Sequence, residues 1–98
     1  MPEVHFTVRW PDGAEERCYS PSTIITDFFK AGETYPLEGF LERARGGLHK
    51  ASARVEARYG FACSSAMDQL KRIEARAKGF EAVQGAEVSL VSMSEGAR

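Results

Sequence analysis

The chain lacks the features that mark several large classes of protein. Its 98 residues contain no apolar run near the ~20 residues that span a bilayer, so we expect no membrane span. Thirteen basic and fourteen acidic residues leave a net charge of -1, which argues against a nucleic-acid binder with its large positive field. Only two cysteines and two histidines are present, and their spacing matches no metal site and no CxxC redox pair. We therefore expect no metal and no cofactor.

The start of the chain and its length also limit the possibilities. No basic segment followed by an apolar segment opens the sequence, so no signal peptide is expected. Two thiols without an export signal are typical of a cytoplasmic protein that keeps its cysteines reduced. A chain of this length can bury one modest core, which predicts a single domain over residues 1–98 with a frayed tail at about 94–98.

Two segments have the alternating pattern of strands. Residues 4–10 alternate strictly between apolar and polar side chains and predict a half-buried strand. Asp12-Gly13 follows it and is a hairpin signal, so a second, more polar strand is expected over 14–19. Residues 86–92 predict a third strand, which should join the hairpin because two strands alone are marginally stable.

The middle of the chain has helical periodicity. Ser20-Pro21-Ser22-Thr23 is typical of a helix start and predicts a short helix through Phe29. Apolar stripes predict two longer helices over 37–59 and 64–78. Gly46-Gly47 lies inside the first of these, so either a neighbour packs closely there or the helix bends or is interrupted.

Both long helices are followed by a glycine and a phenylalanine. We expect Gly60 and Gly79 to end the helices in the left-handed conformation, with the next residue folding back onto the helix. The element order is then two strands, a short helix, two long helices and a strand. This order predicts an α+β fold in which a helical hairpin covers one face of a small, mainly antiparallel three-stranded sheet.

One candidate pocket lies where two predicted helices begin. A helix N-terminus lowers the pKa of a nearby thiol, and both cysteines lie next to such a start. If the two starts converge, they would form a reactive thiol or a small anion site. Its residues would be Cys18, Ser20, Ser22, Cys63 and Ser64. The favoured alternative is that the cysteines are small buried apolar groups and the serines cap helices, so no catalytic residue is assigned.

The aromatic residues are numerous for one small core: six Phe, three Tyr and one Trp. A sheet with helices on one side leaves its other face open, and an exposed aromatic patch there would be a partner surface. The candidate interface residues are Trp10, Tyr19, Phe28, Phe29 and Tyr35. The alternative, that the core takes most of them, stays open. One core of this size is marginal, which favours a homo-oligomer, first of all a dimer.

Three blocks of sequence carry a resemblance to a known family. They are residues 6–13 (FTVRWPDG), residues 16–23 (ERCYSPST), and residues 59–64 (YGFACS) with 68–70 (DQL). The chain resembles, from about residue 4 to 90, the small nitrogen-starvation-response proteins encoded in bacterial nitrilase (Nit1C) gene clusters. The resemblance implies a cytosolic bacterial protein that acts near a nitrilase, a radical SAM protein, an acetyltransferase and a flavoprotein. These clusters are associated with nitrogen acquisition from nitriles or cyanide, and the resemblance assigns no catalytic residue.

Three functions are compatible with these observations. The first is a non-catalytic accessory or interaction protein of the nitrilase-linked pathway, which self-associates and binds other cluster-encoded proteins. The second is a small enzyme or a ligand or anion sensor that uses the Cys18/Cys63 pocket with its serines. The third is a nitrogen-stress regulator that binds nucleic acid, and the near-zero net charge argues against it. We favour the first and expect no enzyme.

Overall fold

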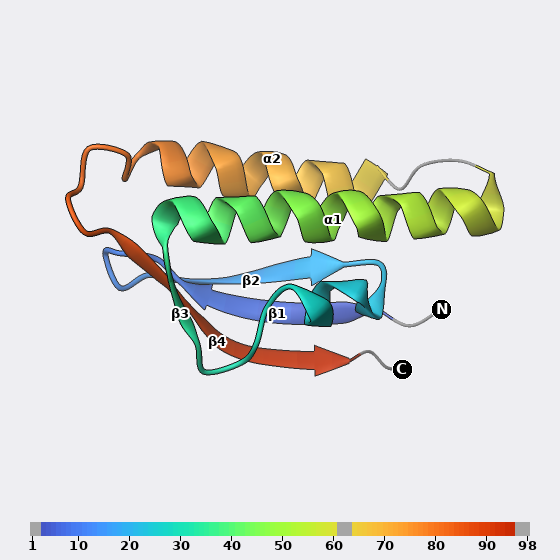
Figure 1. Cartoon of the computed structure of the whole chain (residues 1–98), viewed down its shortest axis with the longest axis horizontal. Helices are drawn as coiled ribbons and strands as arrows, with labels where there is room; N and C mark the ends of the chain where they lie inside the picture. Colours follow the sequence, from blue (N-terminus) through green and yellow to red (C-terminus); the bar gives the residue numbers. More distant parts are fainter. Residues whose placement is uncertain (1–2, 61–63, 96–98) are drawn as a thin grey trace.

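The chain folds into two layers, a sheet and a pair of long helices that lie across one of its faces (Figure 1). The structure is a computed structural model, and it describes residues 3–60 and 64–95. The sheet has four antiparallel strands in the order β2-β1-β4-β3. The elements are β1 (Val4–Arg9), β2 (Glu15–Ser20), η1 (Thr23–Asp27), β3 (Thr34–Pro36), α1 (Leu37–Tyr59), α2 (Ser64–Lys78) and β4 (Glu87–Glu95).

The central strand β1 follows the predicted alternation. Val4, Phe6 and Val8 are fully buried between the sheet and the helices. His5 and Thr7 are half-buried on the opposite face, which no helix covers. Apolar side chains at every second position therefore place the core on the helix side of the sheet.

The prediction of three strands is wrong, because β3 adds a fourth. The predicted order places Thr34–Pro36 in the connection between the short helix and the first long helix. A residue that precedes proline, as Tyr35 does, favours extended geometry. The extended geometry is present, and Tyr35 pairs with Val88 of β4. Three residues are too few to show an alternating pattern, and a proline is tolerated here because β3 is an edge strand.

Strand β4 is longer than expected. It continues to Glu95, whose Cα pairs with that of Val4, so the chain at residues 94 and 95 is a strand and not a frayed tail. The register against β1 shifts between Thr7 and Val8, where β4 contains one extra residue. Such a bulge is difficult to predict from alternation, because it interrupts the pattern on which the prediction depends.

Both long helices have the predicted bounds, and the two glycines within α1 mark a close contact. A Cβ on Gly47 would lie 2.5 Å from Cδ1 of Ile25, and one on Gly46 would lie 2.9 Å from Cε2 of Phe28. Helix α1 runs through both positions, so close packing by a neighbour is confirmed. The neighbour is η1, a 3₁₀ helix that ends earlier than predicted and begins where the Ser22 hydroxyl accepts the Ile24 N–H (3.2 Å).

The two predicted helix ends have different outcomes. Gly60 is left-handed (φ 86°) and its N–H donates to the Glu56 carbonyl at 2.8 Å, as expected, while the following phenylalanine lies outside the described residues. Gly79 lacks a positive φ, so that prediction is wrong. The chain leaves α2 through a tight turn, and Phe80 stacks on Trp10 with the ring centroids 5.9 Å apart instead of folding back on the helix.

Candidate functional site

Cys18 lies in the core and not on a surface. It is 1% exposed, and its Sγ lies 3.9 Å from the carbonyl oxygen of Glu16. Burial, with a smaller contribution from the Glu16 carboxylate, raises the pKa of the thiol to about 12. A reactive thiol needs a lowered pKa, so at neutral pH this thiol stays protonated and is a poor nucleophile.

The serines near Cys18 have structural roles. The buried Ser20 hydroxyl donates to the carbonyl oxygen of Ser22 (2.8 Å) and accepts the Ser22 N–H (3.3 Å). The Ser22 hydroxyl caps η1, as the capping alternative expected. Ser64 is exposed at the start of α2, and Cys63 lies outside the described residues. The shared Cys18/Cys63 pocket therefore stays a prediction.

Gln69 joins the end of β2 to α2, a link that was not predicted from the sequence. The Tyr19 N–H donates to Oε1 of Gln69 at 3.1 Å. Gln69 is 8% exposed, and its Nε2 has no hydrogen-bond partner in the described part of the chain. Its burial could have been predicted from its position in the apolar stripe of α2. Gln69 lies beside Leu70 and about one turn from Ala66 and Ile73.

The five candidate interface residues do not form one patch. Trp10 and Phe29 are each 1% exposed, so they belong to the core instead of a contact surface. Phe28 is half-buried against α1, and Tyr35 is half-buried with its hydroxyl accepting the N–H of Lys30 (3.0 Å). Only Tyr19 is on the sheet face opposite the helices, beside His5 at 5.7 Å between ring centroids. Trp10 and Phe29 each pack on Phe40 inside the core, with 5.6 Å and 5.3 Å between ring centroids.

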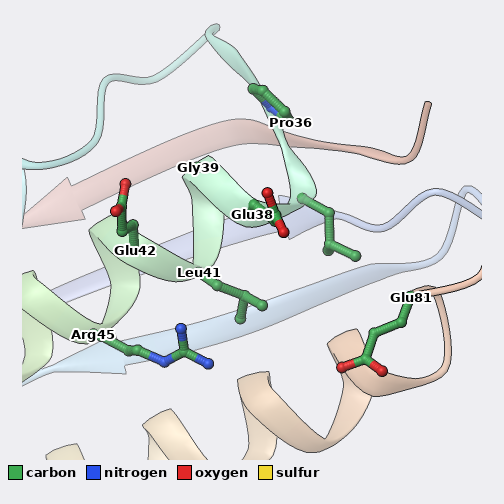
Figure 2. A pocket seen from close by; sticks show the side chains of 8 residues that line it. Pro36, Glu38, Gly39, Leu41, Glu42, Arg45 and Glu81 are labelled. Carbon is green, nitrogen blue, oxygen red and sulfur yellow. The ribbon is translucent and has the colours of Figure 1, made fainter. Parts of the chain in front are cut away.

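A groove of about 850 Å³ opens where the first turns of α1 face the loop after α2 (Figure 2). Its lining residues come from these two distant segments and are Pro36, Leu37, Glu38, Gly39, Leu41, Glu42, Arg45 and Glu81. No sequence pattern predicts this groove, because its two sides lie about half the chain apart. In the sequence, the polar lining residues of α1 are typical of an ordinary solvated helix face.

Two contacts hold the sides of the groove in place. The N–H of Leu37 has no partner within its own helix turn and donates to the carbonyl oxygen of Ala86 (3.0 Å). Phe80, next to Glu81, stacks on the buried Trp10, whose Nε1 donates to Glu16 (2.9 Å). The start of α1 and the loop after α2 are therefore both attached to the same end of the sheet.

The groove is acidic. Glu38, Glu42 and Glu81 are exposed, and no cation lies within ion-pair distance of them among the residues that the structure describes. Arg45 is already paired with Glu74, with 2.7 Å between Nε and Oε2. The described residues contain no group of three His, Cys, Asp or Glu side chains arranged to hold a metal ion. The carboxylates thus form an acidic rim beside apolar Leu37 and Leu41.

Fold and groove together define a small two-layer α+β protein whose sheet is covered on one face and whose helix start opens into an acidic groove. The family model for the nitrogen starvation-induced protein NitG matches residues 5–93, so the chain belongs to this family. The match confirms the part of the sequence resemblance that concerns nitrogen starvation. No curated protein and no solved structure matches the chain. No helix within residues 3–60 and 64–95 meets the length and hydropathy of a membrane span.

Proposed function

We propose that this chain is a non-catalytic accessory protein of the nitrogen-starvation response. In this proposal it acts in the cytoplasm, in a nitrilase-linked pathway that obtains nitrogen from nitriles or cyanide. It self-associates, and it binds a cluster-encoded protein through the groove at the start of α1. The observation that carries the proposal is the acidic rim of Glu38, Glu42 and Glu81 beside apolar Leu37 and Leu41.

The charge of the groove selects the kind of ligand. A helix N-terminus carries about half a positive charge, which would favour an anion. Three carboxylates outweigh that half charge, and the one arginine of the lining is neutralised by Glu74. A groove with this charge and with leucines in its lining fits a segment that carries Lys or Arg next to an apolar side chain.

The contacts that hold both sides of the groove also support binding. Leu37 is held by its bond to Ala86, and the opposite side is held by the stacking of Phe80 on Trp10. A site that is already ordered loses little conformational entropy when a partner binds. Little of the binding free energy is then needed to order the groove, which favours binding of a protein segment there.

The thiol and hydroxyl groups that suggested an enzyme or an anion sensor are poorly suited to those functions. Burial keeps the Cys18 thiol protonated, and the Ser20 and Ser22 hydroxyls are engaged in the turn and cap around η1. A nucleic-acid partner is also disfavoured, because its phosphates would be repelled by the acidic groove and the net charge is -1.

The test is binding of the purified chain to each purified protein encoded in the same gene cluster, first of all the nitrilase. The E42K/E81K variant reverses two exposed charges of the rim and leaves Glu38, which stabilises the first turn of α1. The matched control E33K/E56K reverses two exposed charges elsewhere. We expect E42K/E81K to weaken binding at least tenfold and the control to bind as the wild type does. The proposal fails if no cluster-encoded protein binds, or if both variants bind equally well.

A further inference from the structure

The second half of β4 has an open edge. β1 pairs with β4 as far as Glu95, but β3 pairs only with the first part of β4. The last backbone bonds on the β3 side join Leu90 to Gly32 (2.7 Å) and to Glu33 (2.8 Å). Beyond Leu90, no described strand pairs with residues 91–95 on this side. In Figure 1 the end of β4 (red) lies at the lower border of the sheet.

The backbone groups on the open edge can be assigned from the register. Leu90 turns its N–H and C=O toward β3, and alternate residues of a strand turn the same way. The bulge adds one residue after Leu90, so Met93 is the next residue beyond the bulge that faces the open side. Ser92 and Ser94 then face β1, opposite Thr7 and His5.

The other two sheet edges are protected. On β2, Glu15 and Arg17 are exposed charges, and the Tyr19 N–H is taken by Gln69. The edge strand β3 has only three residues, one of which is Pro36. Of residues 91–95 (VSMSE), Glu95 at the end is the one charged residue, and none is a proline; charge and proline are the usual devices against edge pairing.

We propose that residues 91–95 pair with the same segment of a second copy of this chain. The two segments run antiparallel about a two-fold axis at Met93 and join two four-stranded sheets into one sheet of eight strands. This proposal identifies the surface for the self-association included in the proposed function and rests on that part of it. It does not depend on the groove.

A second copy fits this edge because the segment is complementary to itself. The sequence Ser92-Met93-Ser94 reads the same in both directions. With the axis at Met93, the two Met93 residues exchange N–H to C=O hydrogen bonds, and Ser92 lies opposite Ser94 of the partner subunit. The Met93 side chain is half-buried against the core, so a second Met93 side chain would cover its exposed part. Two-fold symmetry closes the assembly at a dimer, because each copy has one such edge.

Charge substitutions test both the pairing and its register. Light scattering during size exclusion should find a concentrated wild-type protein to be a dimer. The S92K/S94K variant places lysines opposite each other and should be a monomer, whereas S92K/S94E places opposite charges across the axis and should stay a dimer. The control A82K/Q84K adds two charges to the exposed loop before β4 and should not change the dimer.

A cross-linking experiment covers the case in which a lysine variant fails to fold. In a C63S background, S92C and S94C proteins are mixed and oxidised. Residues 92 and 94 of the two copies face each other across a pair without mutual hydrogen bonds, about 4.5 Å between Cα atoms, which suits a disulfide. The mixture should form a covalent dimer, and neither single variant should, because identical positions lie diagonally, about 7–8 Å apart.

The remaining outcomes separate this inference from the proposed function. A wild-type monomer at every concentration overturns both the edge pairing and the self-association. A dimer that persists in S92K/S94K, or that cross-links through S94C alone, overturns the pairing at Met93 but leaves self-association in place. Binding of the nitrilase by a monomeric S92K/S94K variant would leave the role of the groove intact.

Discussion

Cδ1 of Ile25 occupies the space that a side chain on Gly47 would need, 2.5 Å from the position of its Cβ. Ile25 is fully buried, so it cannot turn away into solvent. This contact fixes η1 against the middle of α1 and explains why a helix former is absent from that position. The tolerance of α1 for two adjacent glycines is therefore a consequence of packing.

G47A should destabilise the protein by about 1–2 kcal/mol. Alanine improves helix propensity by up to ~1 kcal/mol, whereas overpacking costs ~1–3 kcal/mol. A Cβ only 2.5 Å from the fully buried Ile25 puts that cost in the upper half of its range, so the loss exceeds the gain. Urea denaturation measures the free energy of unfolding. The matched variant G46A meets the half-exposed ring of Phe28, which can shift, so its loss should be smaller. A G47A protein as stable as the wild type would contradict the close packing of η1.

Cys18 should be unreactive in the folded protein. In a C63S background, a disulfide reagent at pH 8 should label no thiol under native conditions and one thiol in denaturant, because Cys18 is buried with a raised pKa. Rapid labelling of the native C63S protein, at a rate near that of the unfolded chain, would show that Cys18 is accessible.

The same thiol should make stability depend on alkaline pH. The pKa of Cys18 is raised from 9.0 to about 12, so the stability it contributes is complete below pH 9. That contribution is lost as the pH rises from 9 toward 12, because the unfolded chain ionises its thiol first. Denaturation of the wild type and C18A over this range measures it. The stability difference between them should shift against the wild type, and a constant difference would contradict the raised pKa.

Q69A should lower the free energy of unfolding by about 1–3 kcal/mol, because it leaves the Tyr19 N–H at the β2 edge without the Gln69 oxygen. The control K71A removes an exposed side chain of the same helix and should change stability by less than about 0.5 kcal/mol. Thermal unfolding compares the two. Equal, small effects would mean that solvent replaces Gln69 easily and that β2 does not depend on α2 there.

Much of the fold was predictable because its elements have long periodic patterns. Helices α1 and α2 were predicted with the correct bounds, and the alternation of β1 identified the core side of the sheet. Strand β3 was not predicted, because three residues are too few to show an alternating pattern. The turn at Gly79 was predicted wrongly, because Phe80 stacks on Trp10 instead of packing on its own helix. Both features depend on contacts between segments that are distant in the sequence, and a local sequence pattern holds no information about such contacts.

The candidate site was less predictable. Cys18, Ser20 and Ser22 were candidates because of their chemistry, but they are buried or engaged in local hydrogen bonds. The groove depends on the approach of Glu81 to the first turns of α1, which only the tertiary structure supplies. Glutamates on a helix surface are common, and their sequence gives no sign that they share a concave surface.

The acidic groove is tested most directly by the salt dependence of binding to the nitrilase of the same cluster. Attraction between exposed charges is screened by salt, so the wild-type affinity should fall steeply between low and high salt. The E42K/E81K variant should bind weakly at low salt and respond little to further salt, while E33K/E56K should follow the wild type. Equal affinities and equal salt dependence for all three proteins would contradict the account.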